Sequence, residues 1–200
     1  MAAAQRPDTL AAVQTALWQE LTRATHDKHH EWRTPVLATV DGEAADARTV
    51  VLREADANDA LLTIFSDARA AKLAQLQAHP VGTLVMWSRR LSWQLRLRVQ
   101  LSAHTEGLAV ASRWARLKLS PAAQDYLSPV TPGEALVPPE MDTHVEANAE
   151  APPAAAAPAA DRGHFALLQA RVLSADWLEL HREGHRRARF DEEGARWLVP

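Results

Sequence analysis

Residues 91–101 alternate apolar and polar side chains over their whole length, and this run constrains the fold more than any other stretch of the chain. Successive side chains of a β-strand point to opposite faces, so the run predicts a strand with one covered face and one solvent-exposed face. Such a strand is typical of an antiparallel sheet. The apolar positions are Leu91, Trp93, Leu95, Leu97 and Val99, and the polar positions are Ser92, Gln94, Arg96, Arg98 and Gln100.

The rest of the chain predicts more strands, with a few helices between them. The ranges 35–40 and 48–53 flank an Asp-Gly turn and predict a hairpin, with Arg48, Val50 and Leu52 on one face of the second strand and Thr49, Val51 and Arg53 on the other. Further strands are expected at 61–65, 81–87, 164–173, 175–180 and 186–191, and helices at 8–25, from Ser66, and at 106–117. The fold class is therefore mainly β with inserted helices (α+β), a small barrel in one domain.

The predicted helix that begins at Ser66 carries an unusual charge arrangement. Ser66 and Asp67 are favourable helix caps, yet Arg69 and Lys72 follow where the helix dipole disfavours positive charge. Cations at that position are explained if an anion binds there, because the free backbone N–H groups and the dipole both attract one. We interpret the anion as a phosphate group. The alternative is a surface helix whose two cations reach into water.

The composition excludes several classes of function. The 200 residues carry a formal net charge of −3, which disfavours general nucleic-acid binding despite basic clusters at 89–90, 96–98 and 186–189. Cysteine is absent, so there is no disulfide, thiolate metal site or cysteine nucleophile. Neither a signal peptide nor an apolar run long enough for a membrane is visible, and we expect a cytoplasmic protein without a membrane partner.

Two segments are distinctive in composition. Residues 129–160 are rich in proline and alanine, and we interpret them as an extended insertion within the single domain 1–200. The segment around His26, His29 and His30 concentrates histidine. A polar loop explains it better than a metal site, because no second ligand cluster of similar density follows.

Four short motifs, in this order, resemble the pyridoxamine 5′-phosphate oxidase family. They are RTVVLR at 48–53, IFSDARAAK at 64–72, QLRLR at 94–98 preceded by Trp87, and HRRARFD at 185–191 between Trp177 and Trp197. The resemblance implies an FMN-binding split barrel, close to a bacterial branch of general FMN-binding proteins, with the flavin at a homodimer interface. The two cations of the 66–72 segment would then bind the FMN phosphate.

The resemblance also assigns residues to the flavin site. Arg48 and the backbone of the following strand would line the flavin, Gln94 would reach it from the partner subunit, and Trp177 and Arg189 would close over its ring. Arg186 and Arg189 are the candidate catalytic residues, as cations that stabilise negative charge on the reduced ring. The full predicted FMN set is Arg48, Val50, Val51, Leu52, Arg53, Phe65, Ser66, Arg69, Lys72, Gln94, Trp177 and Arg189.

The sequence departs from the family where the oxidases hold their substrate. Arg53 stands where they have a lysine, and the middle region offers only Lys118, Ser120 and Tyr126 in place of the tyrosine, arginine and serine that grip the substrate phosphate. We therefore expect an FMN-dependent oxidoreductase whose substrate is not pyridoxamine phosphate. Two alternatives stay open: a flavin-binding module without turnover, and a haem-binding relative that uses His164, His181 or His185.

Overall fold

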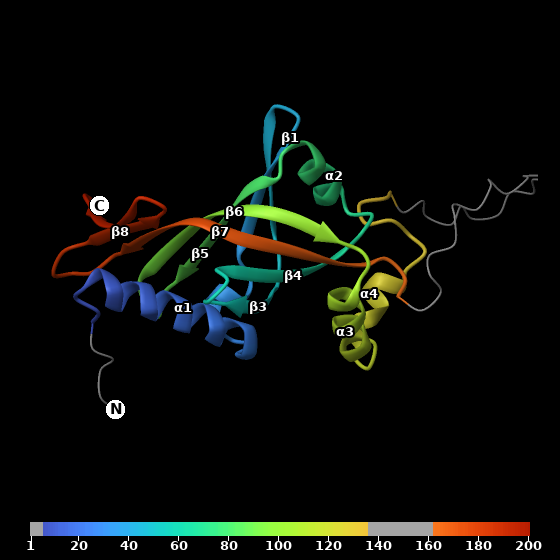
Figure 1. Cartoon of the computed structure of the whole chain (residues 1–200), viewed down its shortest axis with the longest axis horizontal. Coiled ribbons are helices and arrows are strands. Elements are labelled where there is room, and N and C mark those ends of the chain that lie inside the picture. Colours follow the sequence, from blue (N-terminus) through green and yellow to red (C-terminus); the bar gives the residue numbers. More distant parts are fainter. Residues whose placement is uncertain (1–5, 136–161) are drawn as a thin grey trace, which may run out of the picture.

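The computed structural model describes residues 6–135 and 162–200, and antiparallel strands form most of this part of the chain (Figure 1). This confirms the predicted fold class. The strands are β1 (Val36–Asp41), β2 (Ala44–Thr49), β3 (Leu52–Asp56), β4 (Leu61–Asp67), β5 (Val81–Ser88), β6 (Trp93–His104), β7 (Phe165–Glu179), β8 (Arg186–Asp191) and β9 (Gly194–Leu198). The helices are α1 (Leu10–His26), α2 (Ala71–Ala78), α3 (Leu108–Leu117) and α4 (Gln124–Leu127), with 3₁₀ turns at Glu31–Arg33 and Pro121–Ala123.

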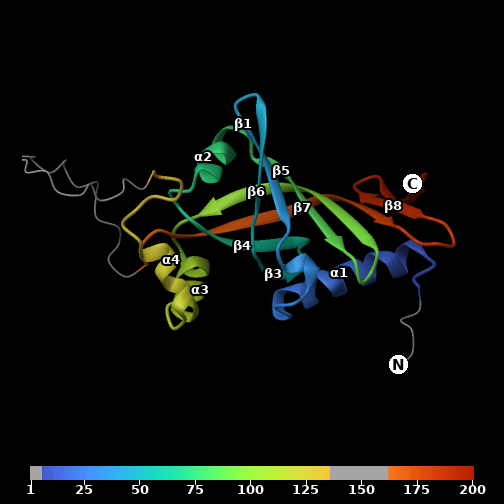
Figure 2. The ribbon, with the colours of Figure 1, turned by 180° about the vertical axis from the view of Figure 1, so that it is seen from behind.

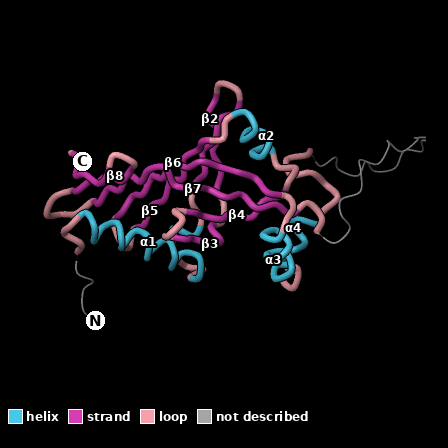
Figure 3. The backbone as a smooth tube through the Cα atoms, in the orientation of Figure 1, coloured by secondary structure: helices cyan, strands magenta, loops and turns pink. Residues whose placement is uncertain are grey.

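The long strands β6 and β7 form the centre of the sheet (Figure 3). Within the described residues the strand order is β2-β1-β5-β6-β7-β4-β3, and β8 and β9 extend the sheet from β7. The sequence predicted two strands at 164–173 and 175–180, and this was wrong. The residues form one strand, and the irregularity between them is a register shift opposite Arg98 and Val99. A bulge of this kind bends a strand without ending it.

Helix α1 runs along one side of the sheet (Figure 2) and its sequence explains why. Val13, Leu17, Leu21 and Ala24 recur at helical spacing and are all buried in the main core. The helix begins where predicted, with the Thr9 side chain accepting a hydrogen bond from the Ala12 N–H at 3.2 Å. Burial of this apolar stripe fixes α1 against the strands.

Helices α3 and α4 form a smaller cluster near the start of β7. Trp114 and Tyr126 pack there against Phe165 with Val110, Ala123 and Leu167. The cluster is joined to β7 by the His164 N–H, which donates to the Tyr126 carbonyl at 2.8 Å. Gly163 makes this close approach possible, since its φ is +54° and a Cβ atom would lie 2.3 Å from that carbonyl oxygen. The second core therefore positions Tyr126 beside the end of β4.

Three predicted segments have different boundaries in the structure. The expected strand 48–53 is interrupted at Val50 and Val51, so that Arg48 ends in β2 and Arg53 in β3. The expected strand 61–65 continues to Asp67, and α2 begins only at Ala71. The prediction that Ser66 or Asp67 caps this helix was wrong, because the cap position is Ala70. Residues 136–160 of the proline- and alanine-rich segment lie outside the described residues.

Candidate functional site

The turn between β4 and α2 leaves the start of the helix without a side-chain cap. The Asp67 carboxylate accepts hydrogen bonds from the Arg69 N–H at 2.7 Å and from the Arg69 guanidinium at 2.8 Å. The buried Ser66 hydroxyl donates to the Asp67 carbonyl. Ala70, at the cap position, offers no side-chain acceptor. The Leu73 N–H donates to the Ala70 carbonyl at 2.8 Å, so the N–H groups of Ala71 and Lys72 keep the hydrogen-bonding capacity that attracts anions.

Lys72 lies in the first turn of α2 and is partly buried. Within the described residues its ammonium group makes no hydrogen bond or ion pair. Burial lowers the pKa of Lys72, and the neighbouring positive charge of Arg48 lowers it further, while Asp67 opposes both effects. A partly buried cation beside a second cation is an unfavourable arrangement that a bound anion would relieve.

Arg48 approaches Lys72 from β2 and is held by a polar network. Its guanidinium pairs with Asp46, donates to the Thr39 hydroxyl, and donates to Gln75 Oε1 at 3.0 Å. Gln75 belongs to α2 and donates in turn to Asp46 at 2.8 Å. This network connects β1, β2 and α2, so that the position of Arg48 relative to Lys72 is fixed by three elements.

Arg69 is held by contacts within the protein, whereas Lys72 is not. Besides Asp67, the Arg69 guanidinium contacts the carbonyl oxygens of Ser128 and Pro129, at 3.0 and 3.2 Å. A hollow of about 430 Å³ includes Arg69 and one side of α2, but Lys72 does not line it. Arg69 therefore reaches an anion beside Lys72 only if it releases some of these contacts. The sequence predicted two cations for the anion, but it did not predict that Asp67 forms an ion pair with one of them, Arg69.

The structure brings Arg53, Phe65 and Tyr126 together beside this turn. The Arg53 guanidinium lies over the Phe65 ring, 5.4 Å from its centroid, and its buried Nε has no hydrogen-bond partner in the described chain. Burial raises the pKa of Tyr126, while the neighbouring Arg53 lowers it. All three residues were candidates from the sequence, but no local pattern predicted that α4 would place Tyr126 next to Arg53 and Phe65.

The remaining predicted flavin residues lie far from α2. Asp67 pairs with Phe165 of β7, whereas Gln94 pairs with Leu178, 13 residues further along the same strand. At about 3.3 Å per residue these positions are separated by roughly 43 Å. Figure 1 likewise shows α2 well away from β8. Helix α2 itself shares a hollow with Leu101–Ala103 of β6, seven to nine residues from Gln94, which is roughly 23–30 Å along that strand.

Two residues at this distant end are committed to the protein's own interior. Trp177 is fully buried, and its ring packs edge-on against Trp93 at 5.3 Å. It offers no exposed surface to a ligand in this structure. The Arg186 guanidinium donates to Glu179 at 2.8 Å and to the Pro7 carbonyl at 2.7 Å. Both side chains thus make contacts inside this protomer, while the buried Trp177 indole N–H has no partner among the described residues; the ring-covering and catalytic roles expected from the sequence stay predictions.

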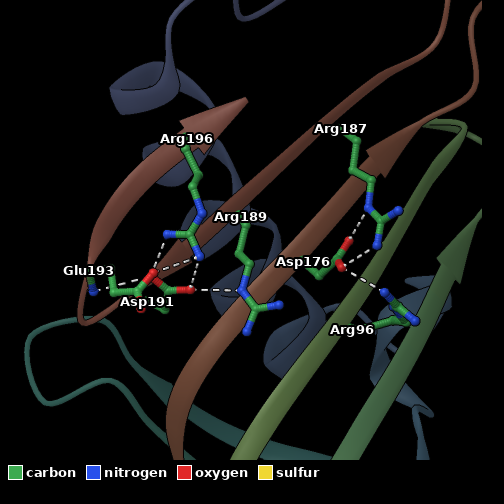
Figure 4. Close-up of polar contacts among 7 residues, drawn as sticks. All are labelled: Arg96, Asp176, Arg187, Arg189, Asp191, Glu193 and Arg196. Carbon is green, nitrogen blue, oxygen red and sulfur yellow. Dashed lines mark hydrogen bonds and ion pairs between the residues drawn. The ribbon is translucent and has the colours of Figure 1, made fainter. Parts of the chain in front are cut away.

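Four arginines at this end, Arg96, Arg187, Arg189 and Arg196, are paired with two aspartates, as Figure 4 shows. Asp176 lies between Arg96 and Arg187, at 2.6 and 2.7 Å, and Asp191 lies between Arg189 and Arg196. Hydrogen bonds, above all from Arg196, lower the pKa of Asp191 to about 2. Arg189 uses its Nε for this contact and remains 42% exposed. It is the catalytic candidate that stays accessible.

The histidines have local roles in the described chain. His30 is buried, and its Nε2 lies 2.7 Å from a Glu20 oxygen while Nδ1 accepts from the Trp32 N–H. Nδ1 of His181 accepts from the Glu183 N–H. Across residues 6–135 and 162–200 we find no group of three or more His, Cys, Asp or Glu side chains that could hold a metal ion. In the same residues no helix has the length and apolar character needed to span a membrane.

Comparison with known proteins gives matches in sequence and in fold. Residues 15–105 match the family model described as pyridoxamine 5′-phosphate oxidase, FMN-binding domain. A pyridoxine/pyridoxamine 5′-phosphate oxidase from Thermosynechococcus vestitus is 34% identical over 111 residues, which cover 50% of this chain and 50% of the relative. The chain thus aligns with about half the length of that curated relative.

Two solved structures resemble most of the chain in fold. A pyridoxamine 5′-phosphate oxidase-related, FMN binding protein from Nostoc punctiforme is 21% identical, with a TM-score of 0.66 and coverage of 93% of this chain and 96% of the other. PhzG from Burkholderia lata, in complex with tetrahydrophenazine-1-carboxylic acid, is 16% identical, with a TM-score of 0.67 and coverage of 93% and 91%. At these identities the likeness establishes a shared fold.

Proposed function

We propose that this chain, which resembles the FMN-binding split-barrel proteins of the pyridoxamine 5′-phosphate oxidase family, binds FMN with the phosphate at the start of α2. The observation that carries the proposal is Lys72, a partly buried cation that makes no ion pair or hydrogen bond in the described chain, at a helix start without a side-chain cap. Such a helix start and an unpaired ammonium are both suited to a phosphate.

We further propose that the flavin lies between two protomers. The start of α2 and Gln94 are separated by roughly 23–30 Å along β6, and in this proposal the flavin takes them from different chains. One protomer would supply Lys72, Arg48 and the backbone from Val50 to Leu52. Its partner would supply Gln94 and Arg189. A homodimer is therefore a requirement of the proposed site.

The function that this site supports is a flavin-dependent oxidoreductase. FMN supplies the ability to accept and return a hydride. The chain's own contribution is to hold the phosphate at Lys72 and to place the exposed Arg189 guanidinium where it stabilises negative charge at the flavin edge. Arg53, with its unpartnered Nε, is available to orient either the flavin or a substrate.

The substrate in this proposal is not pyridoxamine phosphate. Of the three stand-ins for the oxidases' phosphate clamp, Ser120 donates its hydroxyl to the Leu117 carbonyl at 2.8 Å. Tyr126 is only 8% exposed and lies inside the second core. A missing charged clamp removes charge-assisted hydrogen bonds worth about 1.5–3 kcal/mol each.

The cytoplasmic location expected from the cysteine-free composition stays a prediction.

Titration with FMN tests the binding proposal directly. We expect quenched flavin fluorescence and one FMN per protomer in a dimer, measured by fluorescence titration and light scattering. Lys72→Ala should weaken FMN binding by roughly 10- to 100-fold, the loss of one charge-assisted contact. Lys28→Ala, at an exposed loop position, is the matched control and should bind normally. Equal affinity in the two variants would contradict the phosphate site.

Catalysis is tested separately from binding. A flavin store would bind FMN but would not cycle it, whereas an oxidoreductase should reduce the bound flavin with an organic donor and reoxidise it over many turnovers. Arg189→Gln should slow reduction in the FMN-loaded protein while FMN stays bound. If no donor reduces the bound flavin faster than free FMN, the non-catalytic module is the better description.

A further inference from the structure

The sheet has an opening along one edge of β7. On this edge β4 pairs with β7 as far as Arg171, and β8 pairs with it from Ala175 onward. Residues 172–174 between them pair with no strand on this side in the described chain, although the Val172 N–H donates to the Ala60 carbonyl at 2.8 Å. The bulge opposite Arg98 and Val99 falls at the same place. The local strand geometry therefore separates β4 from β8.

A cavity of about 510 Å³ occupies this opening, and α1 closes it on the inner side. Apolar side chains from four elements line it, and residues of the β8–β9 turn form its rim. A volume of this size, mainly apolar with a few polar groups, is typical of sites for small organic molecules. The principal apolar lining residues are Leu17, Trp18, Leu21, Leu97, Val172 and Phe190.

The opening continues into a second, polar hollow of about 340 Å³. The two share Leu173, Ser174, Asp191 and Glu192, and the second hollow adds Arg98. Arg196 and Arg189 in this hollow are already paired with Asp191. In contrast, neither the Arg98 guanidinium nor the Ser174 hydroxyl has a hydrogen bond or ion pair with any described residue. The polar end of the opening thus contains one cation, Arg98, one hydroxyl, Ser174, and one carboxylate, Glu192, without a partner among the described residues.

We propose that this opening binds a small aromatic carboxylic acid. Its ring would lie in the cavity beside Trp18 and Leu97, and its carboxylate would accept hydrogen bonds from Arg98 and Ser174. Glu192, also at this end, would repel the acid and attract a cation, so the charge preference is the sharpest test. The site uses neither α2 nor Lys72, although Arg189, which the proposed flavin site also uses, lines its polar hollow.

The test uses three probes of one size, 2-naphthoate, 2-naphthylmethanol and 2-naphthylmethylamine, titrated calorimetrically into the full chain. We expect 2-naphthoate to bind at least 10-fold more tightly than the other two. Arg98→Gln should reduce its affinity to that of the alcohol and leave the alcohol unchanged. Equal affinity of acid and alcohol, or preference for the amine, would overturn the proposal.

A second pair of variants locates the site. Ala195 is exposed at the rim of the cavity, so Ala195→Trp should fill the opening and abolish binding of the acid. Ala45→Trp, at an exposed strand position outside the cavity, should have no effect. If Ala195→Trp does not fold, the unaltered protein decides: 2-naphthoate should shift the Trp18 indole resonance, assigned through Trp18→Phe. An unshifted Trp18 resonance, or normal binding by folded Ala195→Trp, would overturn the proposal.

Discussion

The two ends of the sheet differ in whether their positively charged side chains form ion pairs. Around β7, β8 and β9 three carboxylates each form ion pairs with two arginines, so most of the positive charge there is balanced by the protein's own side chains. The carboxylates are Glu179, Asp176 and Asp191. At the start of α2, Lys72 is partly buried beside Arg48 and has no ion pair in the described chain. Arginines paired in this way stabilise the fold, whereas a partly buried cation without an ion pair would be stabilised by a bound anion. The predictions below test this difference.

The largest expected effect is on stability, at Glu179. This carboxylate is 4% exposed and accepts hydrogen bonds from Arg6, Arg186 and the Trp93 indole. Glu179→Ala leaves two partly buried cations without this partner, and we expect it to lower the free energy of unfolding by about 3 kcal/mol. Chemical denaturation followed by tryptophan fluorescence measures this. Glu193→Ala, at an exposed turn, is the control, and a similar loss in both would remove the special role of Glu179.

Lys72 should show the opposite behaviour. Lys72→Met removes a desolvated charge without a partner, so the protein without FMN should gain about 1 kcal/mol of stability. The same change should weaken FMN binding, as Lys72→Ala does. Because the pKa of Lys72 is lowered on folding, its destabilising effect is present at neutral pH and disappears as pH rises through its folded and then its unfolded pKa. A loss of stability in Lys72→Met at pH 7 would show that Lys72 has a structural partner.

Acid should weaken the arginine-paired end through Asp176 and Glu179. Burial raises their pKa values, but hydrogen bonds from arginines more than offset this, and both values fall below 3.8 and 4.5. The stabilisation is therefore complete above these unfolded values and is lost as pH falls through the lower folded values. Urea unfolding at pH 6 and pH 3 should show a smaller decrease in Asp176→Asn than in the unaltered protein. An identical decrease would contradict this assignment.

The smallest effect is expected at the exposed pair of arginines on Asp191. Its carboxyl should titrate in NMR near pH 2, and Arg196→Gln should move the midpoint upward more than Arg189→Gln, because Arg196 contributes the largest hydrogen-bond effect. Stability should change little in either variant, since exposed ion pairs contribute little. A large loss of stability in Arg189→Gln would mean that Arg189 also belongs to the structural set.

The sequence predicted which helices and strands form better than it predicted the residues where they begin and end. The alternation at 91–101 predicted β6, and the apolar spacing after Thr9 predicted α1, because both patterns reflect a single face packed on one core. It misplaced the start of α2, because the good capping residues Ser66 and Asp67 were used by β4 and Arg69. It also divided β7 in two, since a bulge and a turn share the same local signals.

The same division applies to the candidate site. The sequence by itself determined which residue types were present near α2, together with a family resemblance carried by short motifs around Arg48, Lys72 and Gln94. Only the tertiary structure decided which cations were left unpaired. Arg69 forms an ion pair with Asp67 and Arg186 forms one with Glu179, and Trp177 is buried in the core. Lys72 forms no ion pair in the described chain. The reason is that pairing depends on contacts between distant strands and loops, and local sequence spacing carries no record of those contacts.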